Sequence, residues 1–296
     1  MQPVIGILSQ PTAGTLAKYG DQYIAASYIK WVEAGGGLAV PIPYDTPTAE
    51  LKEIYESING FLLPGGGVAL GNNVYTRNYQ QMLTWALEEN SAGGWFPVWG
   101  TCFGFQEIAM WAGGSLDLLS PTDSENITLP LHFVGGVAGA EGSELFGSMP
   151  DSVLEIYAQQ AVTMNNHHYS LTPKTYNQTH QLQSFFDVLS TNTDRNGVEF
   201  ISTMEAKEFP FALSQWHPEK PLFEHPPVDV EGINHSSDSI RANVETALFF
   251  ISLARSNNHA YPSHEARANA LIFNYPVVYT EPNDFNFDQC YFFKNR

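Results

Sequence analysis

The sequence predicts a single α/β domain built on a mainly parallel sheet. Short apolar runs that read as buried strands alternate with longer segments whose apolar residues recur at helical spacing, as in parallel strands joined by helical crossovers. Turns rich in glycine and proline separate many of these segments. At 296 residues the chain is long enough to form one large core, and we treat residues 1–296 as one domain.

The first forty residues show this alternation clearly. Residues 4–8 form a short apolar run, which predicts the first core strand. Residues 21–34 carry apolar side chains at spacings of three and four, which predicts an amphipathic helix: Ile24, Tyr28, Trp31 and Val32. Three glycines at 35–37 end this helix, and residues 38–42 are predicted to form the next strand.

The pattern continues to residue 99. Thr46-Pro47 opens a predicted helix that carries Leu51, Ile54 and Ile58. The remaining elements of this half are a strand at 60–63, a helix at 75–89 and a strand at 95–99. Ligands of parallel sheets bind at the carboxyl ends of the strands, and the turn Pro64-Gly65-Gly66-Gly67 falls at that edge.

Beyond residue 113 the predicted elements become shorter. Residues 153–157, 199–204 and 211–215 read as strands, and a long helix is predicted from 239 to about 254. The tail from about residue 257 is aromatic and polar, and we expect it to wrap the core. Cys290 lies in a short apolar run of this tail that predicts a C-terminal strand.

Charge and hydropathy exclude several classes of partner. The chain has 13 basic and 31 acidic residues, for a net charge of −18. Nucleic acids and anionic membranes bind basic patches, so we expect neither as a partner. No stretch reaches the length of a transmembrane helix, which predicts no membrane insertion.

Cysteine and histidine spacing predicts neither a disulfide framework nor a metal site. The two cysteines, Cys102 and Cys290, are far apart, and the nine histidines are scattered. We predict no metal and no cofactor. Three sequons are candidate glycosylation sites, at Asn126, Asn177 and Asn234. No signal peptide is visible, so the chain is either cytosolic or numbered from a mature or engineered N-terminus.

The segment Gly100-Thr101-Cys102-Phe103-Gly104 joins a predicted strand to a predicted helix. A nucleophile flanked by glycines at such a junction is the pattern of a nucleophile elbow. The glycines allow a strained backbone, and the partial positive charge of a helix N-terminus favours the thiolate. The alternative is a small hydrophobic residue packed at a strand end, because free cysteine is often buried.

A cysteine nucleophile needs a base and an orienting partner for that base. His217-Pro218-Glu219 follows a predicted strand, and residues two apart in an extended segment project to the same side. His217 and Glu219 are therefore candidates for base and partner. The alternative is a surface turn.

Gly65-Gly66-Gly67 has no Lys or Ser/Thr at P-loop spacing, so it predicts oxyanion donors more readily than a phosphate cradle. The N–H groups of Gly66 and Phe103 would be the two donors. A plain strand-end turn explains the glycines equally well. His167 lies in a polar stretch that reads as a loop, and a solvated loop is the simplest interpretation of it.

Segments along nearly the whole chain resemble the class I glutamine amidotransferase-like superfamily and, within it, the γ-glutamyl hydrolases. The elbow and His-Pro-Glu are common to the superfamily. The segments that point to the hydrolases are Tyr23-Ile24-Ala25-Ala26-Ser27-Tyr28, Ser202-Thr203-Met204-Glu205 and Gln289-Cys290-Tyr291.

The resemblance implies a flavodoxin-like three-layer sandwich and a site in which Cys102 is the nucleophile, His217 the base and Glu219 its partner. It implies hydrolysis of folylpoly-γ-glutamates without a cofactor, in lysosomes or vacuoles or after secretion, by a protein expected to be a homodimer. His167 falls near a family histidine that lines the site, and Gly65 and Tyr23 are further candidates for substrate binding.

Two departures from the family pattern concern substrate recognition. Phe103 and Gln106 replace the expected Leu and Glu after the cysteine, and Gly67-Val68-Ala69 replaces a Ser-x-Asp-like continuation. The polyanionic substrate needs a cationic pocket, for which Lys18 and Arg77 are candidates only by their proximity to the expected mouth. The alternative functions are a glutaminase subunit, a broader cysteine peptidase or γ-glutamyl transferase, and a non-catalytic binding protein on the same fold.

Overall fold

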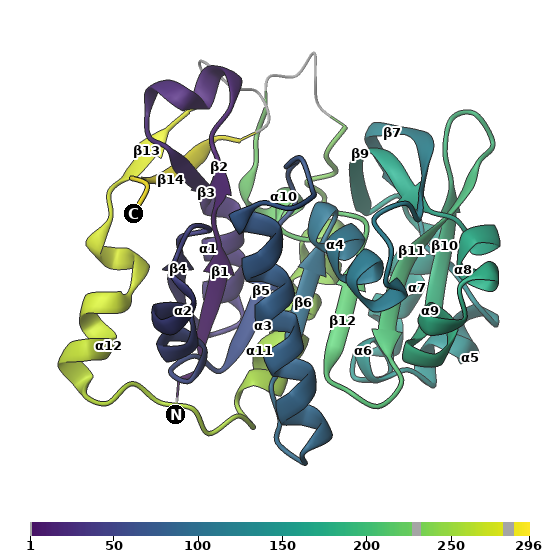
Figure 1. The fold of residues 1–296 in the computed structure, drawn as a ribbon. Coiled ribbons are helices and arrows are strands. Elements are labelled where there is room, and N and C mark those ends of the chain that lie inside the picture. The colour runs from purple at the N-terminus through teal and green to yellow at the C-terminus, as the bar shows by residue number, and fades with distance from the viewer. Residues whose placement is uncertain (1, 227–231, 281–286) are drawn as a thin grey trace.

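The computed structural model describes residues 2–226, 232–280 and 287–296, and a sheet of eight strands lies at the centre of this part of the chain (Figure 1). Five neighbouring strands are parallel, and three further strands extend the sheet in antiparallel pairing. In sheet order the strands are β4 (Leu38–Ile42), β1 (Val4–Leu8), β5 (Gly60–Leu63), β6 (Val98–Thr101), β12 (Phe211–Ser214), β11 (Glu199–Ala206), β10 (Phe186–Thr193) and β8 (His132–Phe133).

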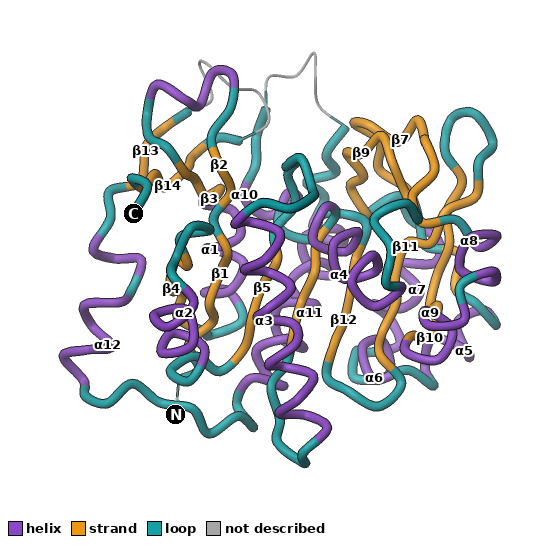
Figure 2. Tube along the Cα trace, viewed as in Figure 1, coloured by secondary structure: helices purple, strands orange, loops and turns teal. Residues whose placement is uncertain are grey.

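Helices cover both faces of this sheet and give a three-layer sandwich (Figures 1 and 2). Alternate side chains of the strands enter different cores: Ile5 and Ile7 pack with α1 and α11, whereas Val4 and Leu8 pack with α2, α3 and α4. The described helices are α1 (Ala26–Ala34), α2 (Thr48–Tyr55), α3 (Val74–Ser91), α4 (Phe103–Gly113), α5 (Gly136–Glu141), α6 (Glu144–Gly147), α7 (Asp151–Gln159), α8 (Pro173–Gln178), α9 (His180–Phe185), α10 (Lys220–Phe223), α11 (Ser237–Ala254) and α12 (His264–Ala270), with 3-10 turns at Gly14–Lys18 and Ile272–Asn274.

Two smaller sheets flank the carboxyl ends of the parallel strands (Figure 2). One contains β13 (Val277–Tyr279), β14 (Gln289–Phe293), β3 (Gln22–Ala25) and β2 (Gln10–Pro11) in that order. The other pairs β7 (Leu119–Leu129) with β9 (Thr163–Leu171). Together they build walls around the edge at which the sequence places the ligand site. The predicted C-terminal strand around Cys290 is confirmed as β14.

Two predicted elements are wrong. Residues 21–25 are predicted as helix, but 22–25 form β3, because this segment pairs with both β14 and β2 before α1 begins at Ala26. Residues 153–157 are predicted as strand but lie within α7, which follows Pro150 and buries Val153, Leu154, Ile156 and Tyr157. Short apolar runs fit strand and helix equally well, and these buried positions have helical spacing. Ile58 lies beyond the end of α2.

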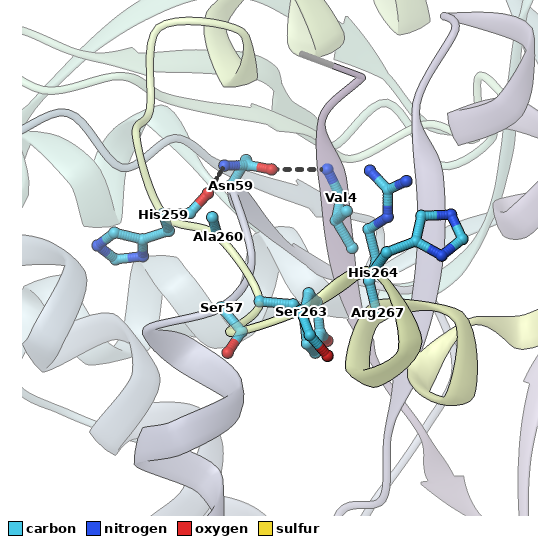
Figure 3. A pocket seen from close by; sticks show the side chains of 9 residues that line it. Val4, Ser57, Asn59, His259, Ala260, Ser263, His264 and Arg267 are labelled. Carbon is cyan, nitrogen blue, oxygen red and sulfur yellow. Dashed lines mark hydrogen bonds between the residues drawn. The ribbon is translucent and has the colours of Figure 1, made fainter.

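The chain after α11 runs along the side of the molecule where α2 lies, and then joins the four-stranded sheet as β13 and β14 (Figure 1). The buried side chain of Asn59 holds the start of this tail. Its Oδ1 accepts a hydrogen bond from the Val4 N–H at 2.8 Å, and its Nδ2 donates to the His259 carbonyl at 2.8 Å (Figure 3). A cavity of about 210 Å³ lies between this junction and α12.

We expect Asn59→Ala to lower the free energy of unfolding by about 2–3 kcal/mol, because it leaves a buried N–H and a carbonyl without their partner. Thermal unfolding followed by circular dichroism should show a Tm about 5 °C lower. Ser57→Ala is the control, because Ser57 lines the same cavity but its hydroxyl donates within its own segment, to the Glu53 carbonyl. Equal Tm values for the two variants would contradict a fastening role for Asn59.

Candidate active site

Cys102 lies at the turn between β6 and α4. β6 ends at Thr101, α4 begins at Phe103, and Cys102 between them has φ 53° and ψ −102°. A positive φ is strained for a residue with a Cβ, and such strain concentrates at functional sites. The Cys102 N–H donates to the Ser214 carbonyl of β12 at 2.7 Å, which holds the turn against the neighbouring strand. The backbone thus has the elbow geometry predicted from the sequence.

The thiol is buried at the carboxyl edge of the sheet, and only 4% of Cys102 is exposed. Its Sγ lies 3.8 Å from the carbonyl oxygen of Asn166 in β9. The first backbone N–H groups of α4 have no acceptor within the helix, so they place partial positive charge beside the sulfur.

His217 and Glu219 follow β12 and lie beside the thiol. The His217 Nδ1 is 2.6 Å from Glu219 Oε1, and both side chains are buried. The backbone N–H of His217 donates to Met164 of β9 at 2.8 Å, which fixes the segment. Burial alone lowers the pKa of His217, but the charges of Glu219 and Cys102 and hydrogen bonds to both outweigh it and raise the pKa to about 9. The imidazole therefore favours its cationic form next to Cys102.

Tyr28 of α1 is a site residue that the sequence reasoning missed. Its hydroxyl lies 3.3 Å from His217 Nδ1 and accepts a hydrogen bond from the Gly65 N–H at 2.8 Å. Burial and the nearby charges of Glu219 and Cys102 raise the pKa of Tyr28 well above its ordinary value, so the phenol stays protonated. The helical pattern predicted Tyr28 to be a core residue, and its ring is indeed buried. Only the fold shows where the hydroxyl points.

The glycine turn after β5 lies against this group. Gln10 supports it from behind, because its Nε2 donates to the Gly65 carbonyl at 3.3 Å. Gly66 has φ 152°, and a Cβ there would lie 1.8 Å from Gln10 Oε1. Only glycine therefore fits at Gly66. Phe103 is the first residue of α4, so its N–H has no acceptor within the helix.

Gly65→Ala should lower kcat at least about a hundredfold, the typical cost of disturbing an oxyanion site. An added Cβ would lie 2.6 Å from the Tyr28 hydroxyl, 2.7 Å from His217 Cε1 and 3.2 Å from Cys102 Cβ. Gly67→Ala is the matched control, because a Cβ at Gly67 meets nothing within 4 Å. Steady-state kinetics of both variants test this prediction, and comparable losses in both would show that the effect is not specific to the site.

A pocket of about 270 Å³ opens above Cys102. Lys220, the first residue of α10, is the single lysine or arginine among its described lining residues and is itself 4% exposed. Lys18 and Arg77 are not among the lining residues, so the structure does not support these two candidates. The lining residues are Tyr23, Gly65, Gly66, Gly67, Cys102, Glu125, Asn166, His168, His217, Lys220 and Phe287.

His167 lies within β9, so its interpretation as a loop residue is wrong. Its ring is buried, with Nδ1 2.9 Å from Ser170 Oγ and Nε2 3.2 Å from Asn165 Oδ1. Burial, together with the nearby His217, lowers the pKa of His167 to about 3, so the ring is neutral. It does not line the pocket, whereas its neighbour His168 does.

The three sequon asparagines differ in their surroundings. Asn126 and Asn177 are exposed. The Asn234 side chain is half-buried and donates to the Ala161 carbonyl at 2.6 Å. Asn126 and Asn177 are therefore the more accessible of the three.

Neither a metal cluster nor a membrane span is found in the described ranges. There, no three or more His, Cys, Asp and Glu side chains gather in a way that could hold a metal ion. Among the described helices, none combines the length and apolar character needed to cross a bilayer.

Comparison with known proteins places this site in a family. The peptidase C26 family model matches residues 3–219, which include the elbow and the His-Pro-Glu segment. The chain belongs to the peptidase C26 family. It is 39% identical to a mouse γ-glutamyl hydrolase, with 99% of this chain and 90% of the mouse protein covered. It is 38% identical to γ-glutamyl hydrolase B of Dictyostelium discoideum, over 94% of this chain and 79% of that protein.

A plant relative is also similar over nearly the whole chain. The C26 chain is 34% identical to γ-glutamyl hydrolase 1 of Arabidopsis thaliana, over 99% of this chain and 83% of that protein. The resemblance to γ-glutamyl hydrolases predicted from short segments is thus confirmed along the whole chain.

Solved structures of more distant proteins share the fold. The glutaminase domain of a Trypanosoma brucei CTPS superposes with a TM-score of 0.54 at 14% identity, covering 88% of the C26 chain and 97% of that domain. A putative GMP synthase subunit from Thermoplasma acidophilum gives a TM-score of 0.53 at 15% identity, over 86% and 96% of the two chains. The predicted flavodoxin-like, class I glutamine amidotransferase-like fold is confirmed.

Proposed function

We propose that this chain hydrolyses the γ-glutamyl amide bonds of folylpoly-γ-glutamates through a γ-glutamyl thioester on Cys102. The bond class follows from membership of the C26 family and from full-length similarity to γ-glutamyl hydrolases. The observation that carries the mechanism is the juxtaposition of a cysteine in an elbow with an imidazole bonded to Glu219.

In the first step, the Cys102 thiolate attacks the γ-carbonyl carbon and a C–S bond forms. The oxyanion accepts hydrogen bonds from the N–H groups of Phe103 and Gly66, and losing one such donor typically costs about a hundredfold in rate. The C–N bond then breaks, and the departing amine takes the proton from the His217 imidazolium. A histidine pKa of about 9 keeps this proton available at neutral and acidic pH.

In the second step, water attacks the thioester and gives a proton to the neutral His217. The C–S bond breaks, the γ-carboxylic acid leaves and loses its proton to solvent, and the thiolate–imidazolium pair is restored. Glu219 holds the imidazole through Nδ1, so that Nε2 serves both proton transfers. The buried, neutral Tyr28 hydroxyl ties the same imidazole to the glycine turn.

We assign Lys220 to a carboxylate of the scissile glutamyl residue, because it is a buried cation in the lining of the Cys102 pocket. Lys220→Gln should raise KM for a γ-glutamyl substrate about tenfold or more, since hydrogen-bonded ion pairs are worth more than neutral pairs when desolvated. Lys207→Gln is the control, because Lys207 pairs with Asp187 outside the pocket at 3.3 Å. An unchanged KM in Lys220→Gln would contradict a role for Lys220 in binding this carboxylate.

Incubation with pteroyl-penta-γ-glutamate at pH 4.5–7.5, with chromatographic separation of the products, tests the proposed function. We expect shortened folates from the wild type, and the product lengths distinguish endo- from exo-cleavage. Glutamine is the comparison substrate, because a glutaminase with the same triad would release ammonia from it. Release of ammonia from glutamine without cleavage of the folate would replace the proposed function by the glutaminase alternative.

We further propose a homodimer that forms through the tail. Phe273, Tyr275, Val277 and Tyr279 are large exposed side chains at every second position, and β13 is the edge strand of its sheet. Antiparallel pairing of two β13 edges about a twofold axis would bury this stripe in both copies. Sedimentation velocity of the wild type and Tyr279→Lys at several concentrations tests this assembly, and a wild-type monomer would exclude it.

We propose a lysosomal, vacuolar or secreted location. The exposed sequon residues Asn126 and Asn177 and the net charge of −18, which an acidic lumen would partly neutralise, support it. Treatment of the protein from its native source with an N-glycosidase tests it, since a mass shift requires passage through the secretory pathway.

A further inference from the structure

A histidine–carboxylate pair lies at the rim of the Cys102 pocket. His168 Nε2 in β9 is 2.7 Å from Glu125 Oε1 in β7, and the two side chains are 66% and 52% exposed. Both residues line the pocket, on the wall formed by the two-stranded β7–β9 sheet. This pair has no part in the chemical steps derived above, which use Cys102, His217 and Glu219.

The backbone of both strands aims these side chains at the pocket. Asn166 and His168 are two positions apart in β9, so they share a face, and the Asn166 carbonyl is the group in contact with Cys102 Sγ. Two residues of a strand span about 7 Å, so His168 lies about 7 Å along β9 from the residue that contacts the nucleophile. On β7 the register shifts between Ser124 and Ile127, and Glu125 lies in this bulge. Bulges often re-aim side chains beside active sites.

The bulge is held in place by neighbouring groups. Asn126 has φ 48°, and its N–H donates to Asn166 Oδ1 at 3.1 Å. Arg195 donates to the Asn126 carbonyl and to Asp123 Oδ1, each at 3.1 Å. Glu125 is thus presented by a fixed backbone, although its side chain is solvated.

Several charged and titratable side chains surround His168. The titratable and charged groups near it are Glu125 on β7, His167 on β9, Lys220 on α10, the Cys102–His217 pair, and the Arg195–Asp123 pair behind the bulge. When the imidazole is neutral, Glu125 leaves an uncompensated negative charge where a polyanionic substrate must enter. When it is cationic, it neutralises Glu125 through Nε2 and retains the Nδ1–H as a donor for a substrate carboxylate.

We propose that His168 forms a second carboxylate-binding position for the γ-linked chain, beyond the residue bound at Cys102, and that Glu125 makes this position effective only at acidic pH. The inference rests on the proposed function for its substrate. Histidine is the side chain that ordinarily changes its charge between pH 5 and 8. KM for long γ-linked chains therefore rises as pH increases through this range, whereas KM for a substrate with a single γ-linked bond changes less.

The test compares pteroyl-penta-γ-glutamate with pteroyl-di-γ-glutamate at pH 5.0 and 7.5 at low ionic strength, where surface charges are least screened. His168→Gln should raise KM for the pentaglutamate about three- to tenfold at pH 5.0 and little at pH 7.5, with kcat changed less than KM. His168→Lys should keep KM low at both pH values. Glu125→Gln should lower KM at pH 7.5.

Asp187→Asn is the matched control for Glu125→Gln, because Asp187 is an exposed carboxylate in an ion pair with Lys207 that does not line the pocket. It removes the same charge without touching the rim. Equal KM values for wild type and His168→Gln with the pentaglutamate at pH 5.0 would overturn the inference. An equally strong effect on the diglutamate would also overturn it, because the pair would then act at the scissile residue.

Failure of the proposed function can be distinguished from failure of this inference. If the wild type cleaves neither folate, the proposed function fails. Calorimetry then compares binding of γ-linked triglutamate to Cys102→Ala and to Cys102→Ala/His168→Gln at the two pH values. Weaker binding to the double variant at pH 5.0 alone supports the second carboxylate position, and equal affinities exclude it.

Discussion

Cys102→Ala is expected to lower kcat for γ-glutamyl hydrolysis by about 10⁴-fold or more, the usual cost of removing a catalytic nucleophile. No other thiol can replace it, because Cys290, the other cysteine of the chain, is buried in β14. The residual rate would come from the oxyanion donors and from substrate binding, which the substitution leaves in place. Single-turnover assays with intact-protein mass spectrometry should show a γ-glutamyl adduct in the wild type and none in the variant.

The fold of this variant should be retained. The thiol contacts the Asn166 carbonyl at 3.8 Å and lies beside His217, and alanine leaves the backbone bond from residue 102 to Ser214 intact. Cys290→Ala is the matched control, because it removes the other buried thiol, which is not among the described lining residues of the pocket, and its kcat should stay near the wild-type value. Wild-type turnover by Cys102→Ala would contradict both the thioester mechanism and the proposed catalytic role of the elbow.

Local sequence patterns predicted much of this molecule because its central strands are buried on both faces. The apolar runs at 4–8, 38–42 and 60–63 correspond to β1, β4 and β5 without any shift. The elbow was predictable because its glycines and cysteine occupy a strand-to-helix junction. The contact between His217 and Glu219 was predicted from an extended segment; the two side chains do meet at 2.6 Å, but Glu219 has helical backbone angles (φ −76°, ψ −30°) just before α10.

The features that the sequence did not predict depend on contacts between distant segments. β3 is a strand because β14, more than 260 residues later, pairs with it; Cys290 lies opposite Ala25. Tyr28 and Lys220 reach the site from α1 and α10. The spacing of apolar residues in a helix does not predict where a tyrosine hydroxyl or a lysine ammonium group will lie. The rim pair is formed by a bulge in β7, whose register is set by β9.

His217→Asn should reduce kcat by about 10³-fold or more, because the leaving amine loses its proton donor and the thiolate loses its cationic neighbour. Burial opposes the charged imidazole, but Glu219 and Cys102 raise its pKa to about 9. The variant should therefore react with iodoacetamide at Cys102 much more slowly than the wild type at pH 6, and the difference should shrink as pH rises. His180→Asn, a substitution on the exposed surface of α9, is the control.

Glu219→Gln separates the charge of this partner from its hydrogen bond. Because the wild-type pKa of His217 is raised above its ordinary 6.5, the cationic state contributes stability that is complete below pH 6.5 and is lost as pH rises through about 9. Removing the Glu219 charge should lower the pKa of His217, so the alkaline limb of kcat against pH moves to lower pH. An alkaline limb that stays near pH 9 in Glu219→Gln would mean that His217 is not the group titrating there, and the proton transfer from His217 to the leaving amine would have to be reassigned.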